Sequence, residues 1–171
     1  GILNQVADKI MFRHIYPDPA GAKTQLSIYS ACSKIAMIMA MLTQAFRYAY
    51  EPFVFGESRD KDNKVIYAKA MKYFIIFTLL AFLAVMFYLD LLKYILKPDY
   101  WGGLKVVPIV MAAEIFMGIF FNLSFWYKLI DETDWGAYFS FTGCAVLVLI
   151  NIVFIPKYGF MACAWGGFAG Y

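Results

Sequence analysis

Charged side chains are scarce in this sequence of 171 residues. Asp, Glu, Lys and Arg make up 16% of it, whereas a soluble domain carries about 25%. Apolar residues reach 63% and the mean hydropathy is +0.64. A globule of this length buries only about 70% of its unfolded surface, so it could not hide that many apolar groups from water. The composition excludes disorder, collagen and coiled coils, and it predicts a protein whose solvent is partly lipid.

Cysteine is also rare, and Cys32, Cys144 and Cys163 lie far apart within apolar stretches. Their spacing provides no CxxC motif, so we expect small buried side chains rather than metal ligands or disulfides. The sequence has no Walker A loop, nucleophile elbow, HExxH or dinucleotide-binding motif. Its net charge of +3 is too small to indicate nucleic-acid binding. We therefore expect no enzyme activity, no cofactor, no metal and no nucleic-acid partner.

No initiating methionine or signal peptide precedes the first apolar segment, and the sequence ends within an apolar run. We therefore expect it to be a fragment of a longer polytopic protein.

Long apolar runs dominate the sequence. A membrane-spanning helix needs about 20 mainly apolar residues to cross a core of about 30 Å, and these runs lack the period-2 pattern of barrel strands. They predict one all-α domain, a polytopic membrane bundle with about five transmembrane helices. Pro52, Pro98 and Pro156 are expected to end or break helices. The predicted helices span residues 1–16, 26–55, 67–97, 104–129, 135–155 and 158–171.

Ionisable side chains inside the predicted spans are the best indication of function, since each costs about 2.5–3.5 kcal/mol at mid-helix. Lys34 lies about 12 Å into its predicted helix. Arg47 and Glu51 are one turn apart, with Gln44 beside them. One hypothesis is that these four residues line a polar cavity whose cations attract an anionic ligand, because guanidinium binds diphosphate well. The alternative is structural: Lys34 reaches the interface or pairs with Glu114, and Arg47 pairs with Glu51.

Acidic residues offer two further candidate sites. Glu114 lies about ten residues into its predicted helix and is a candidate for coupling to a proton or cation, or the partner of Lys34. Asp131, Glu132 and Asp134 form a cluster that could hold Mg²⁺ for diphosphate-alcohol transfer. Because no carboxylate follows them, we expect them instead to cap and begin the next helix.

Three stretches together are similar to one known family. They are residues 28–34 with 44–53 (QAFRYAYEPF), residues 106–109 with 118–128 (GIFFNLSFWYK), and residues 151–159 (NIVFIPKYG) with 164–165. In this order and spacing they resemble polysaccharide biosynthesis proteins. These are lipid-linked oligosaccharide flippases of the multidrug/oligosaccharidyl-lipid/polysaccharide exporter superfamily. The resemblance extends over essentially the whole chain.

The resemblance implies a multi-pass inner-membrane transporter with two six-helix lobes around a central cavity. Such proteins move an undecaprenyl-diphosphate-linked oligosaccharide to the periplasmic leaflet by alternating access. The chain would form most of the second lobe, with residues 56–65 and 131–134 on the cytoplasmic side and Lys34 and Arg47 as cavity cations. Its partners would be the lipid bilayer, the glycan lipid and the N-terminal lobe of the same protein.

Three alternatives remain open. One is a purely structural membrane subunit, in which Lys34, Arg47 and Glu51 would tolerate neutral replacement. A multidrug–cation antiporter of the same superfamily would need Glu114 as its carboxylate. A membrane-embedded, metal-dependent transferase would use Asp131 and Asp134.

Overall fold

The computed structural model describes residues 10–16, 19–56, 63–129 and 134–170, and within these ranges the fold is all-α, with no strand. Residues 10–15 are helical. The elements that follow are α2 (Pro19–Gly56), α3 (Asn63–Phe87), α4 (Leu89–Leu92), η1 (Lys93–Ile95), η2 (Pro98–Gly103), α5 (Val106–Leu129), α6 (Asp134–Tyr158) and α7 (Phe160–Gly170).

Four helices in the described part of the chain are long and apolar enough to cross a membrane. The qualifying spans are Gly21–Pro52, Tyr67–Phe87, Val106–Ser124 and Asp134–Tyr158, and α7 is a shorter apolar helix. In lipid the backbone must satisfy its own hydrogen bonds, which favours helices. The predicted all-α polytopic membrane bundle is thus confirmed.

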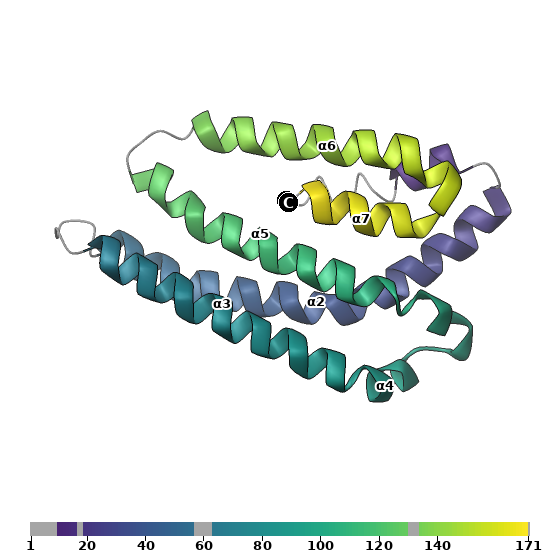
Figure 1. The fold of residues 1–171 in the computed structure, drawn as a ribbon, viewed down its shortest axis with the longest axis horizontal. Coiled ribbons are helices and arrows are strands. Elements are labelled where there is room, and N and C mark those ends of the chain that lie inside the picture. The colour runs from purple at the N-terminus through teal and green to yellow at the C-terminus, as the bar shows by residue number, and fades with distance from the viewer. Residues whose placement is uncertain (1–9, 17–18, 57–62, 130–133, 171) are drawn as a thin grey trace.

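Helix α5 lies in the middle of the bundle (Figure 1). It packs against α2 and α3 on one side and against α7 on the other, and α7 in turn packs along α6. Burial agrees with this order: in an apolar 18-residue stretch of each span, 39% of the residues are buried in α5 but only 17% in α3 and in α6. The outer faces of α3 and α6 expose large side chains such as Leu80, Phe87, Phe141 and Leu149. In a membrane these faces contact lipid.

Two apolar clusters hold the helices together. One joins Phe12, Tyr29, Val106 and Ile155 with the first turn of α7. The other joins α2, α3 and α5 around Met39 and neighbouring side chains. Between them, the clusters fix α2 against α5 along most of the α5 span.

The helix predicted at 67–97 is not continuous. Helix α3 ends at Phe87, and α4 and η1 follow as short pieces up to Ile95. Leu96 and Lys97 are then extended, with ψ of 150° and 147°. The residue before a proline avoids the helical region, so Pro98 explains the extended Lys97.

Helix α6 continues past the stop predicted at Pro156. It ends at Tyr158, followed by Gly159 with a φ of +57°. Pro156 has no N–H to donate to the Ile152 carbonyl, but the later N–H groups can still donate, and the Gly159 N–H bonds the Ile155 carbonyl at 3.0 Å. The start of α2 is also earlier than the predicted residue 26, because Pro19 fits the first turn of a helix. Of the helix predicted at 1–16, residues 1–9 lie outside the described residues.

Candidate functional site

Helices α2, α5 and α7 enclose a groove of about 560 Å³. This volume falls within the range of about 300–1,000 Å³ that is typical of small-molecule sites. The apolar part of the lining is made by alanine, methionine, valine and glycine, and the polar part by Tyr29, Ser33, Gln44, Tyr48 and Glu114. The groove is therefore amphipathic, although it lies between apolar helices.

One face of α2 supplies most of this lining. Tyr29, Ser33, Ala40, Gln44 and Tyr48 recur at intervals of four or seven residues, or close to them, which places them along one stripe of a helix. The Ser33 hydroxyl donates to the Tyr29 carbonyl at 2.7 Å, so it is satisfied within its own helix. The opposite walls are formed by Val110, Ala113 and Glu114 of α5 and by Ala164 and Gly167 of α7.

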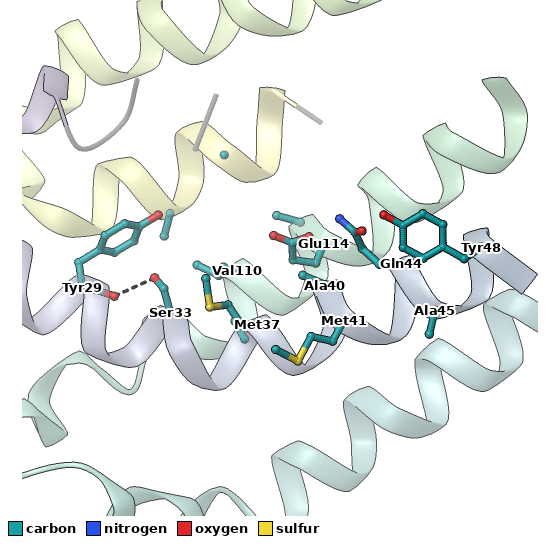
Figure 2. A pocket seen from close by; sticks show the side chains of 14 residues that line it. Tyr29, Ser33, Met37, Ala40, Met41, Gln44, Ala45, Tyr48, Val110 and Glu114 are labelled. Carbon is teal, nitrogen blue, oxygen red and sulfur yellow. Dashed lines mark hydrogen bonds between the residues drawn. The ribbon is translucent and has the colours of Figure 1, made fainter. Parts of the chain in front are cut away.

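Glu114 is the acidic residue of the groove lining. It lies eight residues after Val106 and ten before Ser124, hence about 12–15 Å from either end of the α5 span. Figure 2 shows its carboxylate and the Gln44 amide projecting from α5 and α2 into the space below α7. A carboxylate at this depth is costly and is typical of a functional position.

Arg47 lies beside one end of the groove rather than in its lining. The guanidinium carbon is 5.4 Å from the ring centroid of Tyr48, which does line the groove, and 5.2 Å from that of Phe121 on α5. Its Nε is buried without a hydrogen bond, and Glu51 Oε2 is 4.0 Å away. The predicted pairing of Arg47 with Glu51 thus exists as a long contact that leaves the cation incompletely satisfied.

Lys34 lies near the other end of the groove. Its side chain is exposed and outside the lining, although Ser33 and Met37 on either side of it line the groove. Two residues earlier, the Cys32 thiol donates to the Tyr100 carbonyl of η2 at 3.5 Å. This contact places the part of α2 around Lys34 against η2, the connection between α3 and α5.

The structure therefore separates the candidates that the sequence grouped together. Gln44 and Glu114 line one groove, whereas Lys34, Arg47 and Glu51 lie outside it. Asp134 begins α6, and Asp131 and Glu132 lie outside the described residues. The described residues contain no cluster of three metal-ligating side chains.

Sequence reasoning missed Tyr29, Ser33 and Tyr48 as groove residues. The available signal was their spacing from Gln44 on a single helix face, which predicts a polar stripe inside an apolar span. The wall formed by Ala164 and Gly167 had no such signal, because it depends on how α7 folds back along α5.

The chain matches no known protein-family model, no curated protein and no solved structure. The groove itself is thus the basis for assigning a function.

Proposed function

We propose that this protein is a transporter of the inner membrane that moves a polyprenyl-diphosphate-linked glycan between leaflets. The observation that carries the proposal is the amphipathic groove inside the span, with one cation near each end. Arg47 follows Lys34 by thirteen positions, which corresponds to about 20 Å along α2.

The groove suits an amphiphile whose polar part must cross the membrane. Its polar side chains replace water for a headgroup, and the apolar outer faces of α3 and α6 leave the lipid tail in the bilayer. The cation at each end offers the diphosphate a partner before and after the crossing. Arg47 is the stronger candidate, because the 4.0 Å contact with Glu51 leaves its charge incompletely paired.

We further propose that a second lobe of the same protein completes the cavity. Met37 and Met41 line the groove yet remain 53% and 70% exposed, so this side of α2 has room for a facing partner. Rocking of two lobes would then open the cavity to each leaflet in turn.

The proposal is tested with the full-length protein in cells. Arg47→Ala should abolish glycan display at the cell surface while the protein is still expressed and inserted. Lys97→Ala, which removes an exposed lysine of the α3–α5 connection, is the matched control and should leave display normal. Normal display in the Arg47→Ala strain would overturn the role of this cation.

Glu114 supports a second candidate function, a multidrug–cation antiporter. A carboxylate in the middle of the α5 span can bind a proton or a metal cation and couple its movement to export. This function predicts cation-dependent dye efflux that is lost in Glu114→Gln. Dye efflux without any effect on glycan display would favour the antiporter over the flippase.

A further inference from the structure

We infer that the part of the groove around Gln44 and Glu114 binds the sugar next to the diphosphate of the transported lipid, and not the diphosphate itself. This inference rests on the proposed function and assigns separate places to the two polar parts of the substrate.

The expected sites of the sugar and of the diphosphate differ in charge. Glu114 is the ionisable acid of the groove lining, and neither Lys34 nor Arg47 belongs to that lining. An anionic diphosphate beside Glu114 would be repelled at short range in a medium of low dielectric constant. The diphosphate is therefore expected next to Arg47, outside the groove.

The hydrogen-bonding groups of Gln44 and Glu114 match a sugar better than a phosphate. A carboxylate accepts two or more hydrogen bonds, and a glutamine amide both donates and accepts. Sugar hydroxyls do both as well, whereas phosphate oxygens can only accept. Tyr48 adds an exposed ring one turn beyond Gln44, a flat apolar surface against which a sugar face can pack.

Distances along α2 agree with a covalent link between the two parts. Gln44 precedes Arg47 by three residues, about 4.5 Å along the helix axis. A diphosphate held at Arg47 thus places its attached sugar beside Tyr48, Gln44 and Glu114. The first sugar of the glycan is the one that the groove would recognise.

The test compares binding of undecaprenyl diphosphate and undecaprenyl-diphosphate-N-acetylglucosamine to the full-length protein in nanodiscs. For the wild-type protein we expect the sugar to raise the affinity about tenfold, which is the effect of one or two hydrogen bonds. Gln44→Leu and Glu114→Ala should lose this increment but still bind the sugar-free lipid, and that retained binding shows that they fold. Arg47→Ala should weaken the binding of both lipids.

Two further variants distinguish recognition from a structural role. Glu114→Gln keeps hydrogen bonding but removes charge, so it should retain the sugar increment and bind the sugar-free lipid more tightly than the wild type does. Thr43→Val changes a buried neighbour of Gln44 that lies outside the groove lining, and it should keep the increment.

Each outcome decides between the two proposals. Equal affinity of the wild-type protein for both lipids, or a full increment in Gln44→Leu and Glu114→Ala, would overturn the sugar site and leave the transporter proposal standing. If the wild-type protein binds neither lipid, the proposed function fails, and the sugar site fails with it.

Discussion

Gly159 turns the chain from α6 into α7, and its backbone has a φ of +57°. A side chain there would meet the carboxamide oxygen of Gln25 on α2, and the Gln25 amide donates to the Tyr16 hydroxyl at 2.9 Å. Because Gly159 has no side chain, the α6–α7 turn can approach Gln25 of α2, which in turn contacts Tyr16. The direction in which α7 leaves α6, and hence the α7 wall of the groove, depends on it.

Gly159→Ala should destabilise the protein by about 1–2 kcal/mol, because a non-glycine residue is strained in the left-handed region. Displacement of Gln25 would add to this effect. Thermal unfolding in detergent measures the change, and Gly102→Ala is the control, since nothing lies within 4 Å of the side chain added there. Equal stability of the wild-type protein and Gly159→Ala would show that the turn tolerates a side chain.

At the scale of helices, contact between α3 and α5 depends on a glycine. A side chain at Gly118 would lie 2.5 Å from Phe74 Cζ and 2.9 Å from Thr43 Cγ2. Phe74 is fully buried and packs on Phe46 of α2, with ring centroids 4.8 Å apart. The Phe74 ring thus fills the space that Gly118 leaves where α2, α3 and α5 meet.

Gly118→Val should destabilise the protein by about 1–3 kcal/mol, because the added methyl groups overpack this crossing. Combining it with Phe74→Leu should restore part of the loss, since the smaller side chain makes room. Unfolding of the single and double variants gives the coupling energy. Strictly additive effects would mean that the two residues do not compete for the same space.

The connection between α3 and α5 is held by side chains as well. Lys93 Nζ donates to Asp90 Oδ1 at 2.8 Å, and the Trp101 indole donates to the Lys93 carbonyl at 3.0 Å. The Lys93 ammonium also lies 5.5 Å from the Trp101 ring centroid. Lys93 therefore ties α4 to η2. Such aromatic and basic side chains are typical of the membrane interface.

The hydrogen bond from Lys93, together with its charge, lowers the pKa of the Asp90 carboxyl below its ordinary value. The contribution of Asp90 to stability is therefore complete above the unfolded pKa of about 3.9 and is lost as pH falls through the lower folded value. A carboxyl ¹³C NMR titration in micelles should show this lowered pKa, and Lys93→Met should return it to the ordinary value. Lys97→Met is the control, and an Asp90 pKa unaffected by Lys93→Met would contradict the assignment.

For the molecule as a whole, an exposed side chain can face either lipid or water. Leu80 on α3 is 60% exposed, on the apolar outer face of that helix. Lys34 on α2 is also exposed, but it lies beside the amphipathic groove, next to Ser33 of the groove lining. Because Leu80 is apolar and Lys34 carries a charge beside the groove, we expect lipid at the first surface and water at the second.

Cysteine accessibility distinguishes the two surfaces. In a background with Cys32→Ala, Cys144→Ala and Cys163→Ala, Lys34→Cys should react with a water-soluble thiol reagent more than about tenfold faster than Leu80→Cys, because the reactive thiolate forms only in water. Reaction rates in membranes from cells provide the measurement. Equal, slow reaction at both positions would mean that lipid or protein covers Lys34.

Sequence reasoning succeeded where a property depends on neighbours along the chain. The apolar runs predicted the long helices, since crossing a membrane needs only length and hydropathy. It failed at Pro156, because the end of α6 depends on the left-handed Gly159 that follows. It also grouped Lys34, Arg47, Gln44 and Glu51 as one cavity set, although the structure places only Gln44 of these in the groove lining.

The amino-acid sequence alone indicated a membrane environment and an all-helical fold, because an apolar chain in lipid must satisfy its own backbone hydrogen bonds. It also identified the ionisable residues inside the spans, which are costly in lipid. The tertiary structure decided which of those residues meet. Gln44 and Glu114 are seventy residues apart in the chain, and they share a groove only because α5 lies along α2 and α7 folds back between α5 and α6. Side-chain contacts across helices, not hydropathy, set that arrangement.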